Sequence, residues 1–216
     1  MEKTHEITGG IYLVIDPCQP INLLLQKLES ALKGGVNAVQ IWNNWDKKTD
    51  KLTLVEAIGL LCRKYQVPLF INDEWQLLKQ TLFLDGVHFD TIPNDYEFIK
   101  KAVTRSFMAG ITCSGDLNTV AWASKHQLNY VSFCAMFPSP SAGSCSIVVP
   151  SVVKEAHETT SLPLFVSGGI TPQNIITLKE KTPFDGVAVI SGIMSANDPQ
   201  KQVKIYKDAL GIAPSV

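Results

Sequence analysis

Two glycine-rich segments in the C-terminal part of the chain have the composition of a phosphate site. Residues 166–171 read VSGGIT and residues 189–193 read VISGI, so each places glycine between an apolar run and a predicted helix start. Backbone N–H groups freed by glycine and aimed by a helix N-terminus bind phosphate without a net positive charge. Glycine pairs also make tight turns, and both interpretations stay open at this point. The candidate phosphate ligands are Ser167, Gly168, Gly169, Ser191 and Gly192.

An amide and a carboxylate follow another apolar run directly. Asn72 and Asp73 come immediately after Leu69–Ile71, so both are expected to project from the end of a strand. Oxygen ligands of this kind suit Mg²⁺ and a diphosphate. An aspartate at a strand end is also frequently a helix cap. A role of this pair in binding Mg²⁺ or diphosphate therefore depends on which residues lie beside it.

Three further kinds of residue near predicted strand ends are ambiguous. Gln40 lies in an otherwise apolar run, AVQI, and its amide must pair either with the edge of a bound heterocycle or with a neighbouring strand. His88 is expected to be a core histidine, because no second histidine or nearby cysteine completes a metal set. Trp42, Trp45 and Trp75 either stack on a bound ring or shield the site.

The elements that must position these residues alternate between short apolar runs and longer segments of helical period. Thr171 and Asp198 each stand before a proline, which is the arrangement of a cap and a first helical residue, and Gly34-Gly35 follows a helix end. These signals support the helix boundaries independently of hydrophobicity. The predicted strands are Ile11–Ile15, Ala38–Ile41, Leu69–Ile71, Gly86–His88, Met108–Thr112, Tyr130–Phe133, Leu164–Ser167 and Gly186–Ile190.

Eight such units occupy 216 residues and leave no room for a second domain, so residues 1–216 are predicted to form one compact α/β domain. PLFIN at residue 68 and DGVH at residue 85 resemble PLFVS at residue 163 and DGVA at residue 185. A repeat offset by half the chain favours a (β/α)8 TIM barrel over a doubly wound sheet, although both motifs are also common entries to a buried strand. In such a barrel the active site lies at the C-terminal ends of the strands, where the candidate residues fall.

Composition narrows the class of protein. Nineteen Lys and Arg against twenty Asp and Glu give a net charge of -1, so no global field favours nucleic acid or an anionic membrane. No apolar run approaches the roughly 18 residues of a membrane span, and the first ten residues lack the apolar stretch of a signal peptide, so we expect a cytoplasmic protein. Five cysteines without a CxxC pair are expected to be reduced thiols. A homodimer is compatible with a small barrel, but no apolar stripe demands it.

A series of motifs, in order and in register from about residue 12 to about residue 200, resembles a known family. The motifs are YLVIDP from Tyr12, GGVNAVQ from Gly34, PLFIND from Pro68, DGVH from Asp85, FPSPS from Phe137, GGITPQN from Gly168 and DGVAVISGIM from Asp185. The family is that of thiamine phosphate synthase and its close relative, the thiazole tautomerase. The resemblance implies a Mg²⁺-dependent transferase that joins a pyrimidine methyl diphosphate to a thiazole phosphate, with thiamine phosphate and pyrophosphate as products.

The resemblance also implies roles for individual residues. Gln40 would hold the pyrimidine, Asn72 and Thr112 would contact the diphosphate, and Asp73 would ligate Mg²⁺. Ser139 and Ser141 stand at two threonine positions of the loop after the sixth strand, Asn44 at a position that also contacts substrate, and Gly169 and Ser191 would bind the thiazole phosphate. The implied partners are small phosphorylated molecules.

The chain departs from the family pattern at charged positions. After the strand-two glutamine the family shows Q-x-R-x-K, whereas this chain has Trp42 and Asn44 at the cationic positions, and Ala142 replaces the lysine of the loop after strand six. Lys47 or Lys48 is the candidate replacement for the lost cations. Pro93 stands at the second Mg²⁺ carboxylate, for which Asp90 or Asp95 is the candidate replacement, and Ala135 stands where the tautomerase has its functional histidine.

Three functions are consistent with this pattern. The preserved glutamine, Asn72-Asp73 pair and serine and glycine positions favour an active or impaired thiamine phosphate synthase. The lost cations favour a related barrel enzyme that acts on another phosphorylated heterocycle. A non-catalytic protein that keeps a phosphate or thiamine phosphate pocket is the third possibility.

Overall fold

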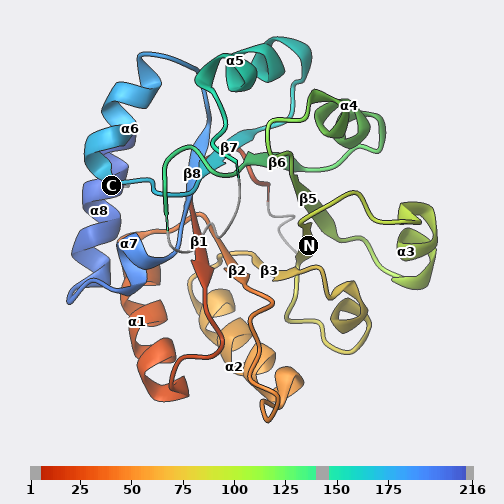
Figure 1. The fold of residues 1–216 in the computed structure, drawn as a ribbon. Helices are drawn as coiled ribbons and strands as arrows, with labels where there is room; N and C mark the ends of the chain where they lie inside the picture. The colour runs from red at the N-terminus through yellow and green to blue at the C-terminus, as the bar shows by residue number, and fades with distance from the viewer. Residues whose placement is uncertain (1–5, 140–145, 213–216) are drawn as a thin grey trace.

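The computed structural model describes residues 6–139 and 146–212. Its eight strands are parallel, each pairs with the next along the chain, and β8 pairs with β1, which closes a barrel. Figure 1 shows the strands at the centre and the helices around them. The strands are β1 (Gly10–Ile15), β2 (Ala38–Ile41), β3 (Leu69–Asn72), β4 (Gly86–Phe89), β5 (Met108–Thr112), β6 (Tyr130–Phe133), β7 (Leu164–Ser167) and β8 (Gly186–Val189).

Helices follow the strands in turn, so the predicted (β/α)8 barrel is confirmed. A 3-10 helix stands in place of an α-helix after β3, and a four-residue helix precedes the last long helix after β8. No helix of the described ranges is long and apolar enough to cross a membrane. The helices are α1 (Ile21–Gly34), α2 (Lys51–Lys64), η1 (Trp75–Lys79), α3 (Tyr96–Ala102), α4 (Leu117–Lys125), α5 (Pro150–Thr159), α6 (Pro172–Lys179), α7 (Ser191–Met194) and α8 (Pro199–Leu210).

The helix boundaries expected from the sequence are present as capping hydrogen bonds. Thr171 Oγ1 accepts from the backbone N–H of Asn174 at 3.2 Å, and the Asn174 side chain accepts from the backbone N–H of Thr171 at 2.8 Å. Asp198 accepts from the backbone N–H of Lys201 at 3.0 Å, and Gly35 adopts the left-handed conformation, with φ 88°, at the end of α1. These caps satisfy backbone groups that a helix leaves unpaired at its ends.

One hydrogen-bond bracket recurs at the start of every even-numbered strand. An asparagine or aspartate directly precedes each of these strands, and its side-chain oxygen accepts from a backbone N–H of the preceding odd-numbered strand at 2.7 to 2.9 Å. Its own backbone N–H donates back to the carbonyl of that same residue at 2.7 to 2.8 Å. The four brackets join Asn37 to Ile11, Asp85 to Leu69, Asn129 to Ala109, and Asp185 to Leu164.

The internal repeat is therefore fourfold in structure. The sequence shows only its two aspartate copies, at Asp85 and Asp185, because asparagine takes the same place in the other two quarters. Either residue serves, since the bracket needs only an oxygen acceptor and a backbone donor. The expectation of two similar halves is correct, and the physical repeat is half as long.

The resulting strand register stacks the inward side chains in layers of four. Each odd-numbered strand contributes two inward residues, one nearer the start of the strand (lower layer) and one nearer its end (upper layer). An inward residue of each even-numbered strand lies between these two levels. Gln40, for example, pairs with Phe70 of the lower layer on β3 and with Val14 of the upper layer on β1. This alternation is the usual packing of the fold. The lower layer is Tyr12, Phe70, Gly110 and Phe165; the middle layer is Gln40, His88, Ser132 and Ala188; the upper layer is Val14, Asn72, Thr112 and Ser167.

The bracket predicts that position 185 tolerates asparagine but not alanine. Asp185→Ala removes the acceptor of the Leu164 N–H and should lower the free energy of unfolding by about 2 kcal/mol. Asp185→Asn keeps the acceptor, as Asn37 and Asn129 do naturally, and should cost less than about 1 kcal/mol. Urea denaturation of both variants measures the difference, and equal losses would contradict the bracket as the stabilising contact.

Candidate functional site

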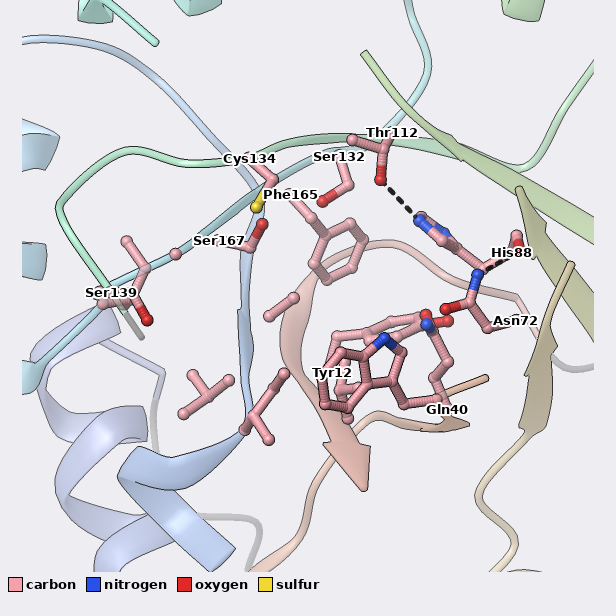
Figure 2. Close-up of a pocket in the computed structure, with 18 of the residues that line it drawn as sticks. Tyr12, Gln40, Asn72, His88, Thr112, Ser132, Cys134, Ser139, Phe165 and Ser167 are labelled. Atoms are coloured by element: carbon pink, nitrogen blue, oxygen red, sulfur yellow. Dashed lines mark hydrogen bonds between the residues drawn. The ribbon is translucent and has the colours of Figure 1, made fainter. Parts of the chain in front are cut away.

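A cavity of about 350 Å³ opens at the C-terminal ends of the strands. Side chains of the upper and middle layers form its walls, and the loops after β6, β7 and β8 close one side (Figure 2). The structure brings most of the predicted site residues to this one cavity. Those that line it are Gln40, Asn72, Asp90, Thr112, Ser139, Ser167, Gly168, Gly169, Ser191 and Gly192.

Three predicted site residues are placed differently. Asn44 lies outside the lining, and its amide donates to Asp16 Oδ1 at 3.1 Å. Asp73 lies outside the lining, next in sequence to the lining residue Asn72, and has φ 55°. Ser141 lies outside the described residues, as does Ala142. The structure thus supports a direct ligand contact for Asn44 less well than for the residues that line the cavity.

Two carboxylates and one amide form a cluster at the rim beside β3 and β4. Asp73 Oδ1 accepts from the backbone N–H of Asp90 at 3.0 Å, and Asn72 Nδ2 donates to Asp90 Oδ1 at 3.0 Å. Burial raises the pKa of Asp73, and the negative charge of Asp90 raises it further. A cation between the two carboxylates would relieve this repulsion, so the cluster has the donor set of a Mg²⁺ site.

Aromatic rings form the floor of the cavity. Tyr12, Phe70, Tyr130 and Phe165 are each no more than 2% exposed, and their ring centroids lie 5.4 to 5.8 Å apart. Tyr130 fits because Gly110 carries no β-carbon, which would overlap the tyrosine ring. The site therefore ends on a rigid apolar surface.

A chain of hydrogen bonds crosses this floor and ends in the cavity. The hydroxyls of Tyr12 and Tyr130 lie 2.7 Å apart, Tyr130 Oη lies 2.9 Å from His88 Nδ1, and His88 Nε2 lies 2.9 Å from Thr112 Oγ1. Burial lowers the pKa of His88 to about 4, so the imidazole is neutral at pH 7. His88 is buried, as predicted for a core histidine, but it also lines the cavity and contacts Thr112, a predicted site residue.

The alternatives for Gln40 and the tryptophans are now distinguishable. Gln40 is 5% exposed and lines the cavity, and its amide has no hydrogen-bond partner among the described residues. Trp42 also lines the cavity, whereas the Trp45 ring lies under Lys51 Nζ and Trp75 packs edge-on against Phe98. Gln40 is thus available to a ligand, and of the three tryptophans only Trp42 borders the cavity.

The described lining contains no lysine or arginine. Lys47 and Lys48, the candidate replacements for the lost cations, are exposed and lie outside the lining. The described lining therefore offers an anion backbone N–H groups, hydroxyls and amides.

The glycine-rich loops at the other end of the cavity are held firmly. Gly168 and Gly169 have φ 79° and 65°, values that disfavour other residues. Asn174 Nδ2 donates to the carbonyl of Gly169 at 2.8 Å, and Tyr206 Oη donates to the carbonyl of Ile170 at 2.9 Å. Beside this loop, α7 begins at Ser191. A short extra helix after β8, next to the loop after β7, is the frequent phosphate site of this fold.

Several lining residues were not predicted as site residues. They include the floor residues Tyr12, Tyr130 and Phe165, together with Ser114, Ser132 and Cys134. The twofold alternation along each predicted strand is the signal that finds most of them, because Ser132 and Cys134 share a strand face with Tyr130. Their closeness to Gln40 depends on closure of the barrel.

The comparisons with known proteins agree with this arrangement. The family model described as thiamine monophosphate synthase matches residues 11–193. The chain belongs to this family. A thiamine-phosphate synthase from Nitrosococcus oceani is 28% identical over 92% of this chain and 91% of that protein. One from Wolinella succinogenes is 31% identical over 92% of this chain and 87% of that protein.

Solved structures show the same fold. A thiamine phosphate pyrophosphorylase from Pyrococcus furiosus superposes with a TM-score of 0.79 at 20% identity, covering 94% of this chain and 95% of that one. An orotidine 5'-phosphate decarboxylase from Pyrococcus horikoshii superposes with a TM-score of 0.66 at 12% identity over 92% of this chain and 99% of that one. At such identities the structural likeness establishes the barrel, and the family rests on the sequence.

The hydrogen-bond chain on the floor makes a prediction about cooperativity. Tyr130→Phe leaves both Tyr12 Oη and His88 Nδ1 without their partner and should lower the free energy of unfolding by about 3 kcal/mol, whereas Tyr12→Phe breaks one bond and should cost about 1 kcal/mol. The double variant should be little less stable than Tyr130→Phe alone. Denaturant titrations of the three variants measure this, and strictly additive losses would contradict a connected chain.

Proposed function

We propose that this protein is a Mg²⁺-dependent thiamine phosphate synthase. In the proposed reaction the bond between the pyrimidine methylene carbon and the diphosphate oxygen breaks, and the leaving diphosphate keeps the electron pair. The thiazole nitrogen then bonds to that carbon, which gives thiamine phosphate and pyrophosphate. The observation that carries the proposal is that Asn72 and Asp90 line the same cavity as Gly169 and Ser191. Asp73 accepts a hydrogen bond from the backbone of Asp90 at the edge of that cavity.

The two ends of the cavity would bind different parts of the substrates. At one end, Asn72 and Thr112 would donate to the diphosphate as negative charge develops on it. At the other end, the backbone of Gly168 and Gly169 and the start of α7 at Ser191 would hold the thiazole phosphate. Gln40 would bind the pyrimidine between them, so that binding aligns the thiazole nitrogen with the methylene carbon.

The aromatic floor supports the same reaction. A pyrimidine methyl group that loses diphosphate becomes cationic, and the faces of aromatic rings attract cations. Tyr12 and Phe165 line the cavity directly below the middle layer. Burial also keeps water from this surface, which would otherwise compete with the thiazole nitrogen.

Asp73 and Asp90 are the residues that would hold Mg²⁺. Mg²⁺ in proteins is typically bound by one or two carboxylates together with substrate phosphates, and within the described ranges no cluster of three or more acidic, histidine or cysteine side chains occurs. A pair of carboxylates beside a diphosphate site fits that pattern. The bound ion would supply the positive charge that the lining lacks.

The missing cations support a second candidate function. Because no lysine or arginine lines the described cavity, a substrate with less charge than a diphosphate would fit it equally well. A related enzyme acting on another phosphorylated heterocycle, or a non-catalytic thiamine phosphate-binding protein, would need only the phosphate end. Protein that binds thiazole phosphate but forms no thiamine phosphate would favour this alternative.

The cytoplasmic location and the homodimer stay predictions. Support for a reducing compartment comes from Cys18, Cys62 and Cys113, which are free thiols. The partners proposed are small phosphorylated substrates, and the net charge of -1 gives no reason to expect nucleic acid.

The metal site makes the first functional prediction. Asp73→Asn should lower Mg²⁺-dependent formation of thiamine phosphate by about 100-fold or more, because leaving-group stabilisation is lost, while thiazole phosphate should bind with nearly unchanged affinity. Steady-state turnover and calorimetric titration measure the two effects. Asp208→Asn, an exposed position on α8, is the control. Equal losses of turnover and of binding would show that Asp73 is structural.

The phosphate end makes a second prediction. Thiazole phosphate at millimolar concentration should raise the melting temperature of the protein. Because the described lining holds no cationic side chain, the dissociation constant should change by less than about twofold between roughly 50 and 300 mM salt. Tenfold weaker binding at high salt would mean that a cation reaches the phosphate from outside the described lining.

A further inference from the structure

We infer that Ser132 recognises the ligand ring from the side opposite Gln40, so that the cavity selects a planar heterocycle with hydrogen-bonding atoms at two opposed edges. Recognition of a planar ring by Ser132 and Gln40 does not depend on the proposed function. Only the identity of that ring as an aminopyrimidine rests on it. It assigns a specificity role to a serine that the sequence does not single out.

The strand register places the two residues face to face. Ser132 pairs with Thr112 of the upper layer on β5 and with Phe165 of the lower layer on β7. Gln40 pairs in the same way with Val14 and Phe70. Both therefore belong to the middle layer, and β2 and β6 are four strands apart in a closed barrel of eight. Figure 2 shows them on opposite sides of the cavity.

Both side chains are buried and unused by the protein. Each is 5% exposed and lines the cavity. Neither the Gln40 amide nor the Ser132 hydroxyl has a hydrogen-bond partner within residues 6–139 and 146–212. The only fully buried unpartnered side-chain N or O atoms of the described residues are Trp45 Nε1 and Arg105 Nε, so the polar atoms of Gln40 and Ser132 reach the cavity. Two uncommitted polar groups that face one cavity are available to a ligand that pairs with both.

The neighbouring polar groups are already engaged. His88, of the same layer, uses both ring nitrogens on Tyr130 and Thr112. In the layer above, Ser167 Oγ donates to the carbonyl of Phe133 at 3.2 Å. Ala188, the fourth member of the middle layer, is apolar and small. The middle layer therefore offers a ligand polar groups from two directions only, Gln40 and Ser132.

The chemistry of these two groups defines the ring. A primary amide offers a donor and an acceptor side by side and pairs with a ring nitrogen next to an amino group. A serine hydroxyl can donate to a second ring nitrogen across the ring. A 4-aminopyrimidine has this pattern, since one ring nitrogen is adjacent to the amino-bearing carbon and the other lies opposite that carbon. The aromatic floor then packs against the face of the ring.

The test compares two ligands with two proteins. The probes are 4-amino-5-hydroxymethyl-2-methylpyrimidine and the analogue in which a C–H group replaces the ring nitrogen opposite the amino-bearing carbon. Calorimetry measures the affinity of each probe for the unmodified protein and for Ser132→Ala. We expect the unmodified protein to prefer the pyrimidine by about 2- to 13-fold, which corresponds to the free-energy range of one hydrogen bond. Ser132→Ala should bind both probes equally, as weakly as the unmodified protein binds the analogue.

Controls separate this role from a structural one. Ser151→Ala, at an exposed position of α5, should keep the full preference, and Ser132→Thr, which retains the hydroxyl, should keep part of it. An unchanged preference in Ser132→Ala overturns the inference, and so does the absence of measurable binding of either probe. A preference that Ser132 controls in a protein without synthase turnover supports the inference and counts against the proposed function.

Discussion

The register between odd- and even-numbered strands is the constraint on which the rest of the molecule depends, and four side chains hold it at every second strand pair. Each bracket holds the first residues of two neighbouring strands together through a side-chain acceptor and a backbone donor. A slip of one residue would turn every inward side chain outward. Because parallel strands are joined by whole helices, no tight turn can fix their register, and the bracket supplies that information locally.

A fixed register also decides which polar side chains hydrogen-bond to one another within the barrel and which stay available to a ligand. Tyr12, Tyr130, His88 and Thr112 satisfy one another in a continuous chain. The same layers leave Gln40 and Ser132 facing the cavity without hydrogen-bond partners among the residues that the structure describes. The barrel thus combines a rigid floor with a few uncommitted groups above it, which is how a site binds tightly without rearranging.

The two ends of the cavity differ in charge. The glycine-rich end would bind a phosphate through backbone donors and a short helix, and such a site works without lysine or arginine. The carboxylate end repels anions until a cation is bound, because the negative charges of Asp73 and Asp90 are close enough for Asp90 to raise the pKa of Asp73. The loss of basic residues relative to the family pattern therefore falls on the end where a metal ion has the largest effect.

Periodicity and the residues next to strand ends were enough to predict the barrel, its eight strands, its helix caps and ten residues of the cavity lining. The sequence also placed Asn72, Asp73 and the glycine-rich loops at the correct end of the fold. Tertiary structure alone decided that Asn44 turns to Asp16 while Trp42 borders the cavity. Only closure of the barrel brings Ser132 level with Gln40, about 90 residues away in the chain, because height within a barrel depends on register summed across several strands.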